Sequence, residues 1–96
     1  MAAYLHASLE VTDPVAYEQY RQKVPALIAA HGGRYLVRGG ATQVLEGGPQ
    51  GQRQVILEFP DMAHLLAFYN DPAYRPLIAV RQGASKGGQI IAIEGL

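Results

Sequence analysis

The 96-residue chain contains no cysteine and no tryptophan. The absence of thiol groups excludes disulfides, thiolate metal sites and cysteine nucleophiles. An excess of charge is also absent, because eight basic and eight acidic residues give a formal net charge of zero. No long-range field therefore draws nucleic acid or an anionic membrane to the protein. We expect neither of these as a partner.

Long apolar runs are absent as well. No stretch approaches the roughly 20 apolar residues that a membrane-spanning helix needs. The chain runs from Met1 directly into an alternating pattern, without the charged and apolar regions of a secretory signal. We therefore expect a cytoplasmic protein. A chain of this length supplies one hydrophobic core, which predicts a single domain over residues 1–96.

The chain resembles itself at an offset of 48 residues. Residues 9–13 (Leu-Glu-Val-Thr-Asp) align with 57–61 (Leu-Glu-Phe-Pro-Asp), 38–40 (Arg-Gly-Gly) with 86–88 (Lys-Gly-Gly), and 45–47 (Leu-Glu-Gly) with 93–95 (Ile-Glu-Gly). Three matches in one register predict a duplicated unit with halves 1–48 and 49–96.

The first half begins with a strand and a helix. Residues 4–11 alternate between apolar and polar side chains, as in a strand that is buried on one face. Asp13 and Pro14 then supply an N-cap and a proline at the first helical position. Pro25 is expected to kink this helix, which Gly32-Gly33 ends.

One long strand is predicted to follow, made of residues 34–38 and 41–46 and interrupted at 39–40, where the glycine pair permits a bulge or a bend. The second half repeats the order: a strand at 53–59, helical segments, and a last strand at 89–94. Its helices begin at Asp61 and after the Asp-Pro pair at 71–72.

The order βαββαβ predicts a ferredoxin-like α+β fold, in which a four-stranded antiparallel sheet carries its helices on one face. The other face stays open. If Leu9 and Leu57 face the helices, the open face contains Tyr4, His6, Ser8, Glu10, Ile56 and Glu58, with either Ile90 and Ala92 or Ile91 and Ile93. Such a mixed face suits the interior of a barrel formed by two sheets, so we predict a two-fold homodimer.

Five motifs along the chain resemble one bacterial family, the domain of unknown function DUF1330. They are Val-Thr-Asp-Pro at 11–14, Gly-Gly-Arg-Tyr-Leu at 32–36, Arg-Gly-Gly at 38–40, Glu-Phe-Pro at 58–60, and Tyr-Asn-Asp-Pro-Ala-Tyr at 69–74. The resemblance implies a dimeric α+β barrel. That superfamily also includes cofactor-independent monooxygenases, muconolactone-type isomerases and haem-binding enzymes, so the resemblance implies an architecture and no particular reaction.

His6 is the first candidate site residue. Strand alternation directs its imidazole into the expected barrel cavity, where it could transfer a proton near neutral pH. The alternative is a histidine that hydrogen-bonds across the dimer interface. His31 and His64 lie near helix ends, and the three histidines show no metal-ligand spacing, so no metal and no cofactor is predicted.

Three more residues complete the predicted ligand-binding set. Arg38, next to the glycine pair, offers a guanidinium to a carboxylate ligand, or pairs with Glu46 or Glu58. Glu58 acts as a base if it is desolvated, or forms an ion pair. Tyr69 closes the mouth of the cavity, or packs in the core.

These residues support a homodimer that binds a small, partly apolar organic molecule near His6, Arg38, Glu58 and Tyr69. One alternative is a cofactor-independent monooxygenase or isomerase, in which a cavity base deprotonates the substrate. The other alternative is a structural dimer without a ligand.

Overall fold

A computed structural model describes residues 1–48 and 52–96. The start of the second predicted half, residues 49–51, lies outside the described residues. The elements, in chain order, are β1 (Ala3–Val11), α1 (Pro14–Ala30), β2 (Arg34–Arg38), β3 (Arg53–Phe59), α2 (Met62–Tyr69), α3 (Arg75–Gly83) and β4 (Ser85–Glu94).

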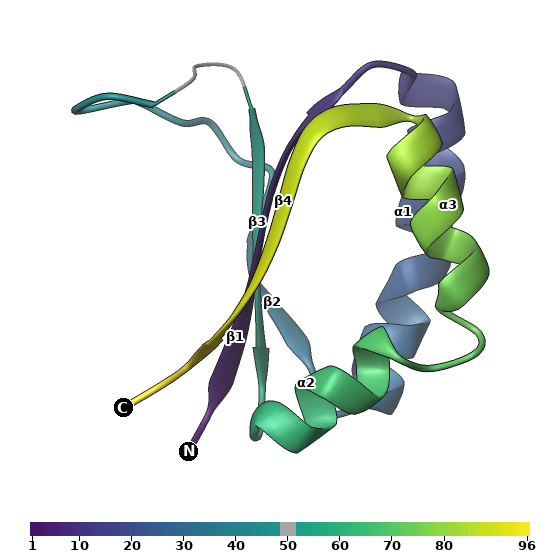
Figure 1. Cartoon of the computed structure of the whole chain (residues 1–96), viewed down its shortest axis with the longest axis vertical. Helices are drawn as coiled ribbons and strands as arrows, with labels where there is room; N and C mark the ends of the chain where they lie inside the picture. The colour runs from purple at the N-terminus through teal and green to yellow at the C-terminus, as the bar shows by residue number, and fades with distance from the viewer. Residues whose placement is uncertain (49–51) are drawn as a thin grey trace.

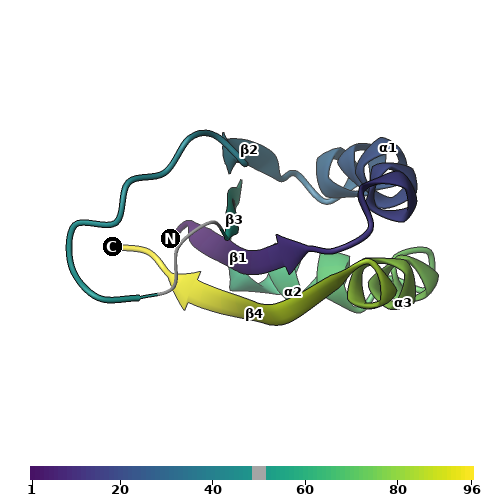
Figure 2. The same ribbon diagram turned by 90° about the horizontal axis from the view of Figure 1, so that it is seen from above.

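The four strands form one antiparallel sheet in the order β2-β3-β1-β4. All three helices cover the same face of this sheet, and the other face carries no helix (Figures 1 and 2). The predicted ferredoxin-like α+β fold is therefore confirmed. Within the described part of the chain, no helix has the length and apolar character needed to cross a membrane.

The core lies between the sheet and the helices. Alternation in β1 and β3 sends Leu5, Leu9, Leu57 and Phe59 to the helix side, where each is at most 5% exposed. Phe68 of α2 packs against Phe59 with ring centroids 5.5 Å apart. This layer of apolar side chains fixes the distance between the sheet and the helices.

Two aspartates begin the helices as the sequence predicts. An Asp13 carboxylate oxygen accepts the Ala16 backbone N–H at 3.1 Å, and Asp61 accepts the His64 backbone N–H at 2.8 Å. Each bond satisfies an N–H that has no partner within its helix. Helix α1 continues through Pro25 to Ala30.

The predicted strand at 41–46 is wrong. The strand β2 ends at Arg38, and residues 41–48 are exposed and form no strand. The Gly39 N–H still bonds the Gln54 carbonyl at 2.8 Å, but β3 begins at Arg53. Among the described residues, no strand lies opposite the segment beyond Gly39 to complete a ladder.

The chain bends at Gly39, as expected for the glycine pair at 39–40, and a bulge lies in β4. This strand begins at Ser85, four residues earlier than predicted, because Ser85 and Lys86 pair with the end of β1. The register shifts where Gly87 adopts a φ of 62°. Gly39, 48 residues earlier, has a φ of 68°. The aligned glycines therefore share a left-handed conformation, which only glycine adopts without strain.

Strand register decides which residues of β4 face away from the helices. Ile93 lies opposite Tyr4 and Ile91 lies opposite His6, and directly paired residues share a face. Of the two predicted sets, Ile91 and Ile93 therefore belong to the open face, and Ile90 packs against the core.

Candidate functional site

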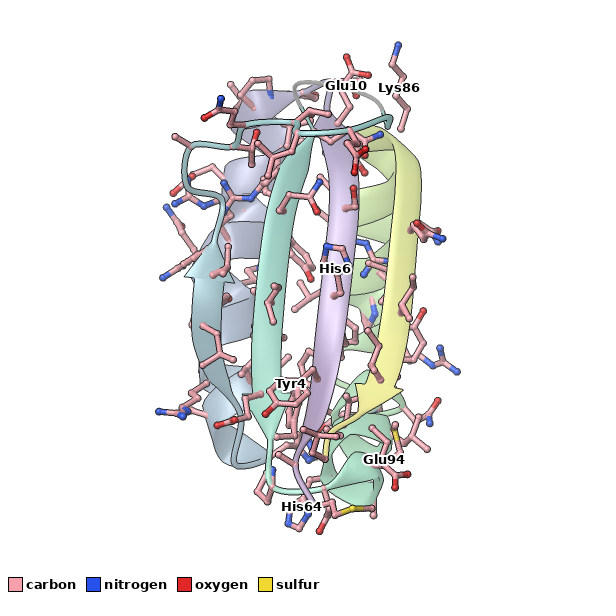
Figure 3. All side chains as sticks on the ribbon, turned by 90° about the vertical axis from the view of Figure 1, so that its left-hand side faces the viewer. Tyr4, His6, Glu10, His64, Lys86 and Glu94 are labelled. Carbon is pink, nitrogen blue, oxygen red and sulfur yellow. The ribbon has the colours of Figure 1, made fainter. Side chains whose placement is uncertain are left out.

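His6 and Glu58 lie on the open face of the sheet. Tyr4 and His6 project from the side of the sheet that is turned to the viewer in Figure 3, away from the helices. Glu58 pairs directly with Tyr4 in the register of β1 and β3 and therefore shares this face.

His6 begins a chain of side-chain hydrogen bonds along the open face. Its Nε2 contacts Gln54 Oε1 at 2.7 Å, Gln54 Nε2 donates to Ser8 Oγ at 2.9 Å, and Ser8 Oγ donates to Gln52 Oε1 at 2.6 Å. Because an amide oxygen only accepts, His6 Nε2 must be the donor in the first contact. The chain therefore has one direction, from His6 to Gln52.

Glu58 is held as an ionised carboxylate. Arg34 on β2 donates Nε and Nη2 to its Oε1, both at 2.8 Å. These hydrogen bonds from Arg34, with a further one from the Tyr4 phenol, hold the pKa of Glu58 below its ordinary value of 4.5. A carboxylate with a lowered pKa is a weak base, so this geometry favours the ion pair over proton abstraction.

Arg38 and Tyr69 lie on the helix side. Arg38 pairs with the inward residue Val55, and its guanidinium stacks over the Tyr35 ring, 4.5 Å from the centroid. Tyr69 lies against Tyr74 with centroids 5.9 Å apart. The sheet therefore separates Arg38 and Tyr69 from His6 and Glu58, and the four predicted site residues do not line one cavity of the chain.

The helix side contains a cavity of about 40 Å³ between the sheet and α1, α2 and α3. Apolar side chains of the core form most of its wall. The polar part of the lining consists of two residue types: Arg21, Arg38, Arg53 and Arg81, with Tyr17, Tyr20, Tyr35 and Tyr74. Arg38 is exposed, so the cavity reaches the surface beside β2.

Arg81 lines the cavity from α3 and is only 6% exposed. Its Nη1 donates to the Tyr74 hydroxyl at 2.8 Å, and that hydroxyl is 2.8 Å from the Tyr20 hydroxyl. Burial lowers the pKa of Arg81, but the phenol oxygens of Tyr74, Tyr20 and Tyr69 outweigh it and raise the pKa. The guanidinium is thus a permanent cation that neutral oxygens solvate.

Tyr20, Tyr74 and Tyr35, three of the phenols around the cavity, stay protonated at neutral pH. Burial is the largest cause that raises the pKa values of Tyr20, Tyr74 and Tyr35 above the ordinary value of 10.0. These side chains are therefore hydrogen-bond donors at neutral pH and not bases. No histidine or carboxylate lines the cavity within the described residues.

Arg53 forms the wall beside the glycine bend. Its guanidinium lies over the Tyr17 ring, 5.6 Å from the centroid, and a Cβ at Gly39 would overlap it. Gly39 requires glycine for its positive φ, whereas the Arg53 guanidinium is the end of a flexible side chain that can move aside. The buried Nε atoms of Arg53 and of Arg21 have no hydrogen-bond partner among the described residues.

Two features of the sequence indicate that basic side chains lie beside the core. Arg81 follows Tyr74, Leu77 and Ile78 at the spacing of a buried helical stripe, where a cation is out of place. Arg53 lies four residues before the inward Leu57, and strand alternation therefore directs it inward too. A basic residue on the apolar face of a helix, together with another on the inward face of a strand, is a pattern that the sequence alone reveals.

The arrangement can bind an acceptor group and shield it from water. It provides several N–H and O–H donors in an apolar enclosure, where hydrogen bonds are stronger than in water. The described residues include no group of three or more side chains that could hold a metal ion.

Solved structures with the same fold support the architecture. The RPA0582 protein of unknown function from Rhodopseudomonas palustris superposes with a TM-score of 0.81 at 21% identity, over 99% of this chain and 82% of that chain. SnoaB, a cofactor-independent oxygenase from Streptomyces nogalater, gives a TM-score of 0.71 at 14% identity, over 98% and 92% of the two chains. A dimeric ferredoxin-like protein of unknown function from Jannaschia sp. CCS1 gives 0.67 at 16% identity, over 99% and 100%.

No functionally curated protein matches the sequence. The family defined as a domain of unknown function, DUF1330, matches residues 2–96, nearly the whole chain. The resemblance carried by the five sequence motifs is thereby confirmed, and the chain belongs to the DUF1330 family.

Proposed function

We propose that this protein is a homodimeric domain that binds a small organic molecule in the cavity between the sheet and the helices of each subunit. The observation that carries the proposal is the cavity itself, in which buried donors converge within an apolar wall. Small-molecule sites typically combine such walls with a few polar groups that fix orientation.

The open face supports the dimer. Val37, Ile91 and Ile93 are 39%, 37% and 48% exposed there, and Ile56 lies between Val37 and His6 in one cross-strand row. A second copy of the chain would cover these aliphatic side chains and gain stability from their burial. The structural relative from Jannaschia is itself described as dimeric.

The segment 41–48 adds to the same argument. It leaves the sheet on the side opposite the helices (Figures 1 and 2) and exposes Val44 and Leu45. Together with His6, Ser8 and strand residues around them, the segment encloses a wide hollow over the open face. A partner sheet entering this hollow would bury both apolar side chains.

The dimer is tested by native mass spectrometry of the wild type, Ile91→Glu and the control Val15→Glu. We expect dimers for the wild type and the control, because Val15 is exposed on α1, and monomers for Ile91→Glu. A monomeric wild type at tens of micromolar, or a dimeric Ile91→Glu, would contradict dimerisation through this face.

Ligand binding is tested by NMR titration with a library of compounds of few heavy atoms. We expect shifts at the cavity residues Tyr20 and Tyr74, and a loss of these shifts in Ala7→Val, which fills the cavity. Ala3→Val, a buried position on the same strand outside the cavity lining, is the control. Shifts centred on His6, or none at all, would contradict the proposed location.

A cofactor-independent oxygenase is the second candidate, and the observation that favours it is the structural likeness to SnoaB. The cavity supplies donors that would stabilise an oxyanion but no side chain that would remove a proton, since its phenols are neutral. A substrate for such a reaction would have to enter already ionised. Binding therefore ranks ahead of catalysis.

A further inference from the structure

The cavity concentrates positive charge in a protein whose net charge is zero. Four of the eight basic residues of the chain line it, and none of the eight acidic residues does so. Arg21 pairs with Glu18 at the surface at 3.0 Å. Arg38, Arg53 and Arg81 have no carboxylate within ion-pair distance in the described residues.

Among the four arginines that line the cavity, Arg81 is the most deeply buried. A buried charge is normally paired or neutralised, because its transfer from water costs several kcal/mol. Arg81 is 94% buried, and the partners that surround it are neutral phenols. The folded chain therefore retains, in the lining of the cavity, a cation without a counter-charge among the described residues.

The two buried side-chain atoms without a hydrogen-bond partner among the described residues are both donors. They are the Nε–H groups of Arg21 and Arg53. In the Tyr20–Tyr74 contact one hydroxyl donates to the other, and Arg81 donates to the Tyr74 oxygen. One of the two phenolic protons is thus left to donate elsewhere. A ligand that completes this site must accept several hydrogen bonds.

The size of the cavity limits the group that enters it. A water molecule needs about 10–15 Å³ on this measure, so 40 Å³ holds roughly three or four heavy atoms. That is the size of a carboxylate with the carbon that bears it. An aromatic ring, for which a cavity of about 150 Å³ is known to suffice, does not fit inside it.

We propose that the cavity binds the carboxylate group of a small organic acid, with its two oxygens among the donors of Arg81, Arg53 and the Tyr20–Tyr74 pair. The planar guanidinium matches the two oxygens of a carboxylate. Apolar residues such as Val24 and Leu57 contact the carbon that bears the carboxylate, and any longer part of the acid extends past Arg38 to the surface. This inference rests on the proposed function, which places a ligand in the cavity.

The test compares acids with their neutral amides by NMR titration at constant ionic strength. The pairs are acetate with acetamide, propionate with propionamide, and benzoate with benzamide, and inorganic phosphate and chloride serve as competing anions. We expect at least one acid to bind about tenfold or more tightly than its amide, the equivalent of one charge-assisted hydrogen bond.

Two arginine variants test which side chain causes the tighter binding of acids than of amides. In Arg81→Met the ratio of acid to amide affinity should fall by about tenfold, while Arg75→Met, an exposed position on the same helix, should leave it unchanged. If Arg81→Met fails to fold, Arg53→Met replaces it, with a loss of the ratio expected again. An unchanged ratio in the folded variant overturns the inference.

The remaining outcomes separate the two proposals. Equal binding of acids and amides in the cavity overturns the carboxylate inference and leaves the proposed function intact. Phosphate or chloride binding as tightly as every acid overturns it as well, because the site would then take any anion. If no compound of either kind shifts the cavity residues, the proposed function fails together with the inference.

Discussion

The two faces of the sheet differ in whether their charged side chains have partners of opposite charge. On the open face the acidic side chains have basic partners: Glu58 contacts Arg34 at 2.8 Å, and Glu10 contacts Lys86 at 3.7 Å. On the helix side, four arginines line a cavity without any carboxylate among the described residues. In the single chain, Glu58 and Glu10 thus have counter-charges where solvent already screens charge, whereas Arg53 and Arg81 have none among the described residues where burial makes charge costly.

This difference in ion pairing indicates that the helix side of the sheet is not optimised for stability. Exposed ion pairs contribute little, so their presence on the open face requires no functional reason. A buried cation without a counter-charge lowers stability, and such a cost is typical of binding sites. The comparison therefore directs the functional hypothesis to the cavity and the assembly hypothesis to the open face.

The largest expected effect compares two neighbours in β3 that face opposite sides. Leu57→Ala should lower the free energy of unfolding by about 2–5 kcal/mol, because Leu57 is 3% exposed in the core. For Ile56→Ala, the loss in the free energy of unfolding should be smaller at low protein concentration and larger at high concentration, because the proposed dimer would cover the part of this half-buried side chain that the single chain leaves exposed. Urea denaturation at two concentrations measures both, and a concentration-independent cost for Ile56→Ala would contradict the dimer interface.

Arg81→Met should change the free energy of unfolding less than Leu57→Ala does, and in the opposite direction. Replacing a buried, uncompensated cation with an apolar side chain of similar length should leave the free energy of unfolding unchanged or raise it by about 1–2 kcal/mol. Arg75→Met on the exposed side of α3 serves as the control. A loss of about 3–5 kcal/mol would show that the Arg81 charge is fully compensated in the folded chain.

The smallest effect concerns the ion pair of the open face. The pKa of Glu58 in the folded protein is lowered by Arg34, so its stabilisation is present above its ordinary pKa of 4.5 and is lost as the pH falls through the folded-state pKa. In Glu58→Gln this contribution is absent at every pH. The difference between the free energies of unfolding of the wild type and of Glu58→Gln should therefore be constant above about pH 5.5 and shrink below pH 4.5.

Denaturation curves between pH 3 and 7 measure this difference. Glu46→Gln, which removes an exposed carboxylate from the segment 41–48, corrects for the change in net charge. A difference that persists unchanged at pH 3 would contradict the assignment of the lowered pKa to Glu58.

Local signals predicted most of the fold. The alternation of β1 and β3, the capping aspartates Asp13 and Asp61, and the βαββαβ order all depend on near neighbours in the chain. The strand expected at 41–46 was wrong because a strand needs a partner, and whether β3 extends opposite to it is a property of the whole sheet.

The candidate site was less predictable than the fold. Alternation placed His6 on the open face, as the structure shows, but Arg38 lies on the helix side because the register of β2 shifts between Tyr35 and Val37. A shift of one residue exchanges the two faces of a strand. The convergence of Arg53 and Arg81 also depends on packing, since they come from a strand and a helix distant in the chain.

The sequence by itself determined the elements, their order, the family and the layered ferredoxin-like architecture, because hydrophobic periodicity and capping act over a few residues. Only the tertiary structure decided where the charges meet. Arg81 becomes a buried, uncompensated cation solely because α3 packs it against Tyr74 and Tyr20. Local patterns set which side chains turn inward, and the packing of distant elements sets which of them become neighbours.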